Sequence, residues 1–200
     1  MTNPSPRGDR RRMRIGLLGG SFNPLHEGHL HVARIALRLL RLQQIWLLVS
    51  PGNPLKPAKG MAPFATRLQQ AAAQVDGRRI LATGIEAGLG TRYTADTLAA
   101  LLIRFPRARF VWLMGADNLE QLPHWRHWRN IAAQVAIAVL PRPTYNHRAL
   151  SGQAARTLRA MRLPARAAPV LANATPPAWV FLPTPQHTAS ATAIRAARAA

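Results

Sequence analysis

The sequence predicts an α/β protein with a doubly wound parallel sheet, and three segments support this prediction. Residues 15–18 form a short apolar run that stops at Gly19-Gly20 and is followed by helical periodicity. Residues 45–49 form a second apolar run directly after that helix, and residues 110–114 form another that ends just before Asp117. Strand, helix and strand joined by a right-handed crossover begin such a sheet. We therefore expect the ligand site at the carboxyl ends of the strands.

The composition fits one domain, because 200 residues with 48% hydrophobic content can bury about 70% of the surface that the unfolded chain exposes. Residues 1–12 are polar, proline-containing and basic, and we expect a disordered tail there and a single domain over residues 13–200. The absence of cysteine favours a cytoplasmic setting. No segment approaches the roughly 20 apolar residues of a membrane span, so no membrane partner is expected.

The net charge of +20 raises the alternative of a basic nucleic-acid-binding protein. Lys56 and Lys59 are the only lysines, which leaves 25 arginines among the 27 basic residues, many of them scattered through Ala-rich and Leu-rich segments. Such scatter indicates a bias toward arginine rather than a shaped binding stripe, and no nucleic-acid-binding motif is present. We expect no specific nucleic-acid partner, although the charge should attract small phosphorylated substrates.

The segment from Gly19 to His29 contains the first candidate site. Glycines after a strand allow a ligand to approach the backbone, and the helix that follows offers free N–H groups and a positive dipole end to a phosphate. His26 and His29, three residues apart, lie on the same face of its first turn. Taken singly, a Gly-Gly turn is more often punctuation and a histidine near a helix start is more often a surface residue.

The chain from Gly28 onward predicts alternating helices and strands. A helix with an apolar stripe runs to about Leu42 and precedes the strand at residues 45–49. A loop rich in proline follows, in which Lys56 either reaches a phosphate or is a solvated loop lysine. Weaker patterns predict a helix at residues 64–75 and a strand at 79–82.

Residues 91–98 form the second informative segment. Thr94 suits the N-cap of a helix that continues to Phe105, and Asp96 lies in its first turn, where a negative charge suits the dipole. Asp117, just beyond the strand at residues 110–114, is either an acceptor for a ribose hydroxyl or an ordinary helix cap.

The remaining segments add two aromatic residues and a final helix. Trp125 and Trp128 are three residues apart on a predicted short helix, where core packing is the alternative to ligand binding. Strands are predicted at residues 135–140 and 179–182, with partial helix over 146–168. Three residues of a predicted final helix, capped at its start, combine hydroxyl groups and a guanidinium that suit an anion: Ser190, Thr192 and Arg195. Taken alone, this segment is more often an ordinary capped helix.

Three motifs resemble those of bacterial nicotinate mononucleotide adenylyltransferases, members of the nucleotidyltransferase superfamily. Residues 19–29 match every fixed position of the signature G-G-[ST]-F-[ND]-P-x-H-x-G-H; residues 93–98 match Tyr-Thr-x-Asp-Thr-Leu; and residues 190–195 match [ST]-x-[ST]-x-[ILV]-Arg. The resemblance implies a Rossmann-like sheet of nucleotidyltransferase type. The chain departs from the family at Arg92, where a small hydroxyl residue is frequent, and after Ala200, where the family usually continues through a further helix; whether it forms a homo-oligomer stays open.

The resemblance implies transfer of the adenylyl group of ATP to nicotinate mononucleotide, with Mg²⁺ held mainly by ATP phosphates and water; we assign it no protein ligand. His29 would contact the α-phosphate and His26 a neighbouring phosphate oxygen. The other residues that the resemblance assigns to ATP are Gly19, Gly20, Ser21, Phe22, Asp117, Ser190, Thr192 and Arg195. Those assigned to the mononucleotide are Tyr93, Thr94, Asp96, Trp125, which would stack on the pyridine ring, and Lys56. The alternative is a sister adenylyltransferase that acts on phosphopantetheine or nicotinamide mononucleotide.

Overall fold

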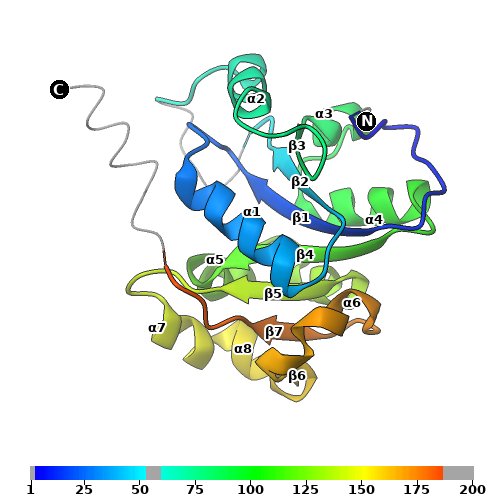
Figure 1. The fold of residues 1–200 in the computed structure, drawn as a ribbon. Helices are drawn as coiled ribbons and strands as arrows, with labels where there is room; N and C mark the ends of the chain where they lie inside the picture. The colour runs from blue at the N-terminus through cyan, green and yellow to red at the C-terminus, as the bar shows by residue number, and fades with distance from the viewer. Residues whose placement is uncertain (1–2, 53–59, 187–200) are drawn as a thin grey trace.

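The computed structural model describes residues 3–52 and 60–186, which fold around one sheet of parallel strands (Figure 1). The strand order is β3-β2-β1-β4-β5-β7-β6. The strands are β1 (Arg14–Gly20), β2 (Gln44–Val49), β3 (Ile80–Thr83), β4 (Arg109–Gly115), β5 (Ala136–Leu140), β6 (Arg162–Leu163) and β7 (Trp179–Phe181). The doubly wound parallel sheet predicted from the sequence is thereby confirmed.

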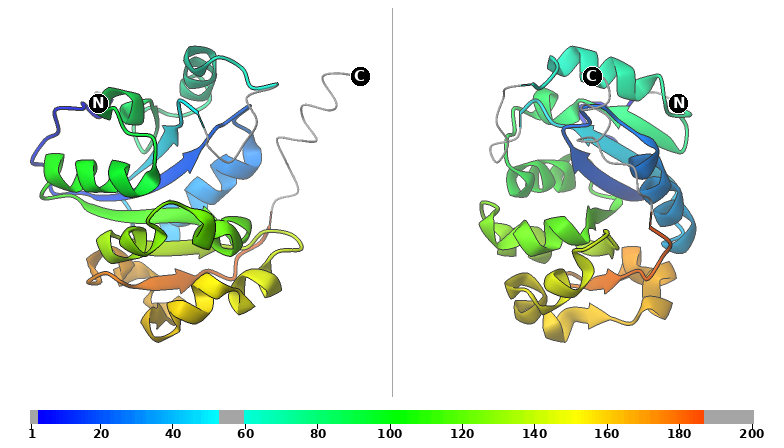
Figure 2. Two further views of the ribbon diagram at one scale, coloured as in Figure 1. Left: turned by 180° about the vertical axis from the view of Figure 1, so that it is seen from behind. Right: turned by 90° about the vertical axis from the view of Figure 1, so that its left-hand side faces the viewer.

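Helices cover both faces of the sheet, as the views in Figure 1 and Figure 2 show. One face packs against α1 (Glu27–Leu39), α2 (Phe64–Ala72) and the 3-10 helix η3 (Ala165–Asn173). The other packs against α3 (Ile85–Leu89), α4 (Thr94–Arg104), α5 (Ala116–Gln121), α6 (Trp128–Gln134), α7 (Asn146–Ser151) and α8 (Gln153–Thr157). Two short 3-10 helices are η1 (Leu122–His124) and η2 (Arg159–Met161).

Strand residues alternate between the two cores because successive side chains of a strand point to opposite faces. In β2, Trp46 and Leu48 enter the core beneath α4, whereas Ile45, Leu47 and Val49 enter the core beneath α1. Every residue of β2 is buried, which explains why the central strands are continuous apolar runs in the sequence.

Element boundaries differ from the predicted ones by a few residues, and α1 shows why. The predicted helix continues to Leu42, but α1 ends at Leu39 because Arg41 takes a left-handed conformation with φ 49°. The Leu42 N–H then donates to the Leu37 carbonyl, which closes the helix end. Leu40 and Leu42 stay buried beyond the helix, so their apolar pattern resembled one more turn.

Neither α3 nor the short edge strand β6 was predicted from the sequence. Each has five residues or fewer, so hydrophobic periodicity cannot reveal them. Within the described ranges, no helix is long and apolar enough to cross a membrane.

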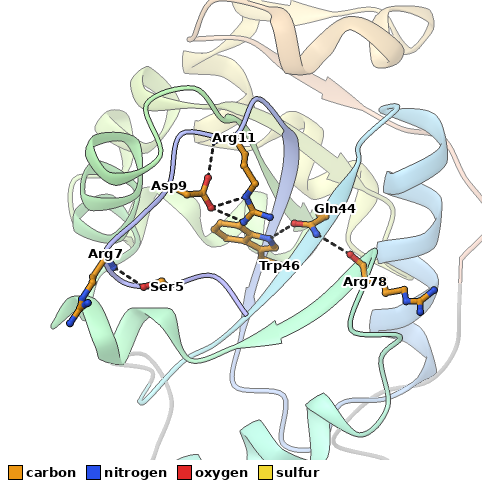
Figure 3. Close-up of polar contacts among 7 residues, drawn as sticks. All are labelled: Ser5, Arg7, Asp9, Arg11, Gln44, Trp46 and Arg78. Atoms are coloured by element: carbon orange, nitrogen blue, oxygen red, sulfur yellow. Dashed lines mark hydrogen bonds and ion pairs between the residues drawn. The ribbon is translucent and has the colours of Figure 1, made fainter. Parts of the chain in front are cut away.

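The N-terminal segment, expected to be disordered, follows a defined path over residues 3–12. Its Gly8 N–H donates to the Ser5 carbonyl at 2.9 Å, and its Asp9 N–H donates to the Arg104 carbonyl at the end of α4 at 3.1 Å. Figure 3 shows the ion pair between Asp9 and Arg11, whose closest atoms are 2.6 Å apart. The same view shows the buried Trp46 indole donating to Gln44 at 3.1 Å.

Candidate active site

The candidate site lies where the sheet changes winding direction. β1 lies beside β2 on one side and beside β4 on the other. After β1 the chain adds β2 and β3 toward one edge of the sheet, and from β4 onward it adds the remaining strands toward the other edge. In open parallel sheets, ligands bind outside the carboxyl ends of the strands at such a point. Gly20 ends β1 and Gly115 ends β4, so the predicted site residues that follow them lie at this edge.

Gly19 and Gly20 were predicted to lie in a loop, but they are the last two residues of β1. A Cβ atom at Gly19 would lie 2.7 Å from Cη2 of Trp112, which is closer than van der Waals contact permits. A Cβ atom at Gly20 would lie 3.2 Å from the ring of Phe22. The Trp112 indole occupies the space that a side chain at Gly19 would need, so packing requires glycine there. The approach of ATP to the Gly19 backbone stays a prediction.

His26 and His29 come together at the start of α1. His26 is the N-cap residue: its Nδ1 accepts from the Gly28 N–H at 3.1 Å, while Nδ1 of His29 lies 3.3 Å from the His26 N–H. The ring centroids are 3.8 Å apart, which confirms that the two side chains share a face. Because a neutral imidazole that accepts at Nδ1 carries its proton on Nε2, both rings direct a donor away from the helix backbone.

Phe22 connects β1 to these histidines. Its ring is buried and meets the His29 ring edge-on, with centroids 5.0 Å apart. Its backbone has φ 43°, a conformation that non-glycine residues rarely adopt. The buried side chain is a packing element, so any contact of Phe22 with ATP would involve the backbone.

Arg67 of α2 is a residue that the sequence analysis missed. Its guanidinium is buried and donates to the carbonyl of Ser21, directly after β1, at 2.6 Å and to that of Ser50, directly after β2, at 2.9 Å. A signal was present, because Arg67 occupies the apolar stripe of its helix between Phe64 and Ala71.

The start of α4 differs from the prediction by one residue. Tyr93, not Thr94, is the N-cap residue, and its side chain makes no capping hydrogen bond. Thr94 is the first helical residue, and Asp96 is exposed in the first turn, as predicted. The hydroxyl that lies against the Tyr93 carbonyl belongs to Thr97, at 3.2 Å.

Glu86 of α3 lies beneath this helix start and was also missed. The Thr97 hydroxyl lies 3.1 Å from Glu86 Oε1 and 2.8 Å from the Thr91 hydroxyl, which forms a buried polar group at the base of the turn. Burial raises the pKa of the Glu86 carboxyl from 4.5 to about 7, although the hydrogen bond from Thr97 opposes this rise. Glu86 and Thr97 are eleven residues apart and belong to different helices, so no hydrophobic periodicity in the sequence indicates their contact.

Trp125 and Trp128 were predicted on one helix, but they lie in different segments. Trp125 follows η1, and Trp128 begins α6 after His127, whose φ is 53°. Trp128 is buried in the core, as predicted, whereas Trp125 is half-buried against Trp112, with ring centroids 6.3 Å apart and planes at 85°. Among the described side chains, the buried indole N–H groups of Trp112 and Trp125 have no hydrogen-bond partner.

Asp117 lies in the first turn of α5, two residues beyond the end of β4. It is half-buried, and its Oδ2 lies 3.9 Å from Nε of Arg142. Gly115, not Asp117, is the N-cap residue of α5, so the helix-cap alternative for this carboxylate is wrong.

Contacts link several predicted residues across the carboxyl edge of the sheet. Gly19 lies against Trp112, which contacts Trp125; the adjacent Arg126 places its guanidinium carbon 4.7 Å from the centroid of the Tyr93 ring. Lys56, Ser190, Thr192 and Arg195 lie outside the described residues. The described residues contain no group of three or more acidic, histidine or cysteine side chains that could hold a metal ion.

Comparisons with known proteins agree on one family. The sequence model of the cytidylyltransferase-like family matches residues 17–197. A protein named "probable nicotinate-nucleotide adenylyltransferase" from Gluconacetobacter diazotrophicus is 63% identical over 189 residues, covering 94% of this chain and 88% of that protein. One of the same name from Gluconobacter oxydans is 62% identical over 183 residues, covering 92% and 94%.

A solved structure shares the fold. Nicotinic acid mononucleotide adenylyltransferase of Plasmodium falciparum, complexed with NaAD, aligns with a TM-score of 0.67 at 16% identity, covering 92% of this chain and 83% of that one. At this identity the likeness concerns the fold alone.

Proposed function

The chain belongs to the cytidylyltransferase-like family and, within it, to the nicotinate-nucleotide adenylyltransferases; from this premise we propose that it transfers the adenylyl group of ATP to nicotinate mononucleotide. The products are nicotinate adenine dinucleotide and pyrophosphate, in the biosynthesis of NAD. The observation that supports this most is the pair of histidines at the N-terminus of α1, directly beyond the central strand β1.

The reaction needs no protein nucleophile. A 5′-phosphate oxygen of the mononucleotide forms a bond to the α-phosphorus of ATP, while the bond from that phosphorus to the bridging oxygen breaks and pyrophosphate leaves. The attacking oxygen is already anionic, so the protein has to align the two phosphates and stabilise charge on the α-phosphoryl oxygens. Two imidazole donors beside a helix N-terminus are suited to this task.

His29 is proposed to donate to an α-phosphate oxygen and His26 to a neighbouring phosphate oxygen. Both rings have Nδ1 turned toward backbone N–H groups, so Nε2 is the atom that each would present to substrate. His26 is 5% exposed and fixed by capping, whereas the His29 ring contacts the tilted His26 ring and meets the Phe22 ring edge-on. A preorganised donor of this kind acts without reorganisation as charge develops.

The pyridine end of the mononucleotide is assigned to the opposite face of the sheet, where Tyr93, Thr94 and Trp125 lie. Trp125 offers a partly exposed indole for stacking. The free N–H groups at the start of α4 can only donate, which suits a carboxylate better than a carboxamide. Asp96 lies in the first turn of the same helix, and its carboxylate is proposed to contact the mononucleotide directly.

Asp117 is proposed to accept from the adenosine ribose at the end of β4, in competition with Arg142. Ser190, Thr192, Arg195 and Lys56 are proposed to contact phosphate groups. Mg²⁺ would neutralise phosphate charge, held by ATP oxygens and waters, since it retains several waters in most such sites. A cytoplasmic setting is part of the proposal and rests on the lack of cysteine.

The test is pyrophosphate release from ATP and Mg²⁺ with each acceptor in turn. Nicotinate mononucleotide should support turnover, with nicotinamide mononucleotide and phosphopantetheine as the comparison substrates. Turnover with phosphopantetheine and none with nicotinate mononucleotide would replace this proposal by the sister activity.

A further inference from the structure

Arg67 joins segments that are distant in the sequence at the carboxyl edge of the sheet. Its side chain is 1% exposed. Besides the carbonyls of Ser21 and Ser50, it donates from Nε to the Ala62 carbonyl at 2.9 Å and from Nη2 to the Pro51 carbonyl at 3.3 Å. All four acceptors are main-chain carbonyls, so this side chain holds loop backbone after β1 and β2 and before α2.

The buried charge of Arg67 is balanced by dipoles rather than by an acid. None of the ion pairs among residues 3–52 and 60–186 includes Arg67. Its guanidinium carbon lies 5.8 Å from the centroid of the Phe64 ring, and burial lowers the pKa of the side chain. A buried cation costs free energy unless its hydrogen bonds are satisfied, and the planar fork of arginine supplies the donors that four separate carbonyls require.

The contact with Ser21 determines which way the next peptide points. In a trans peptide the C=O and N–H groups are opposed, so fixing the Ser21 carbonyl on the guanidinium turns the Phe22 N–H to the other side. Phe22 has φ 43°, a conformation that costs free energy and persists only where the surrounding structure imposes it. Its ring then meets His29 edge-on. Arg67 thus acts on His29 through Ser21 and Phe22.

We propose that Arg67 is a positioning residue for adenylyl transfer: it does not touch substrate but sets the backbone of residues 20–22, and through Phe22 the ring of His29, for the phosphates of ATP. The identity of the ligand rests on the proposed function, whereas the coupling from Arg67 to His29 does not. Lysine cannot reproduce this arrangement, because its ammonium presents its donors from one point and cannot reach four divergent carbonyls.

The experiment compares Arg67→Lys and Arg67→Met with Arg78→Met, which removes one positive charge from an exposed arginine near the start of β3. We expect Arg67→Lys to lower kcat/KM for ATP by about tenfold or more, since small misplacements at a reacting phosphate are costly. The rise in KM should be larger for ATP than for the mononucleotide. Arg78→Met should stay within about twofold of the parent, as expected for an exposed surface site.

A second measurement does not depend on turnover. The His29 imidazole proton resonances, assigned by their loss in His29→Ala, should shift in Arg67→Lys because the Phe22 ring moves relative to them, and should stay in place in Arg78→Met. If Arg67→Met does not fold, Arg67→Lys decides. The proposal would be overturned if Arg67→Lys folds and leaves both the His29 resonances and the ATP kinetics unchanged. It would also be overturned if the His29 resonances are unchanged and kcat/KM falls equally for ATP and for the mononucleotide. An inactive parent whose His29 resonances still respond to Arg67→Lys would refute the function and keep the coupling.

Discussion

Replacing Glu86 by glutamine should remove a pH-dependent cost to folding. The folded chain holds the pKa of this carboxyl at about 7, against an ordinary value of 4.5. The folded state therefore keeps a proton that the unfolded chain has lost. Below about pH 4.5 both states are protonated and no cost exists; between 4.5 and 7 the free energy of unfolding falls as pH rises; above 7 the full cost remains.

The size of this cost follows from the two pKa values. At about 1.4 kcal/mol per pH unit, the rise from 4.5 to about 7 corresponds to about 3 kcal/mol at pH 8. Glutamine keeps an oxygen that can accept from Thr97 but carries no charge. Glu86→Gln should therefore be more stable than the parent by up to about 3 kcal/mol at pH 8, and by little at pH 5.

Urea unfolding at the two pH values measures the difference directly. Glu120→Gln is the matched control, because Glu120 pairs with Arg148 near the surface and its removal should change the free energy of unfolding by a similar small amount at both pH values. A Glu86→Gln effect that is the same at pH 5 and pH 8, or a parent that gains stability over this range relative to Glu86→Gln, would refute the reasoning.

Four further outcomes are expected. His29→Ala should lower kcat by about 10²-fold to 10³-fold with a smaller change in KM for ATP, measured by steady-state pyrophosphate release; a folded variant with nearly normal kcat would show that His29 is only packing. The protein should prefer nicotinate over nicotinamide mononucleotide by at least about 10²-fold in kcat/KM, because donors at the start of α4 suit a carboxylate. Trp125→Ala should lower kcat/KM for both mononucleotides and leave the ratio of the two values nearly unchanged. Equal kcat/KM for the two mononucleotides in the parent would contradict this account. Duplex DNA binding should be weak and should collapse between about 50 and 200 mM salt; tight, sequence-selective binding at physiological salt would show otherwise.

The sequence predicted the fold well because the central strands are apolar throughout and a helix of clear periodicity joins the first two. The ends of β1, β2 and β4 were all predicted within two residues, and the two histidines were placed on one face at the start of α1. These are local properties, determined by residues three or four apart or by alternation along a strand. Boundaries failed where apolar residues continued past a helix end, as at Leu40 and Leu42.

Contacts between distant segments could not be predicted in the same way. Arg67 reaches the Ser21 carbonyl 46 residues away, and Glu86 meets Thr97 across two helices. The Thr94 cap was misplaced by one residue because Tyr93 takes the extended N-cap conformation without a side-chain capping bond, so no capping side chain marks this position in the sequence. The packing of Gly19 against Trp112 of β4 was missed because nothing local to Gly19 in the sequence indicates this contact.

Because Gly19 and Trp112 lie in contact, a larger residue at position 19 requires a smaller one at position 112. Alanine at position 19 alone would place its methyl group 2.7 Å from the indole, whereas alanine together with a smaller apolar residue at 112 would have room. Substitutions at the two positions should therefore be strongly non-additive in stability. Trp112 also borders Trp125, so an exchange that relieves the crowding at β1 would remove the support of the aromatic side chain proposed to hold the pyridine ring. The support of the Trp125 ring and the residue at position 19 can then be altered only together.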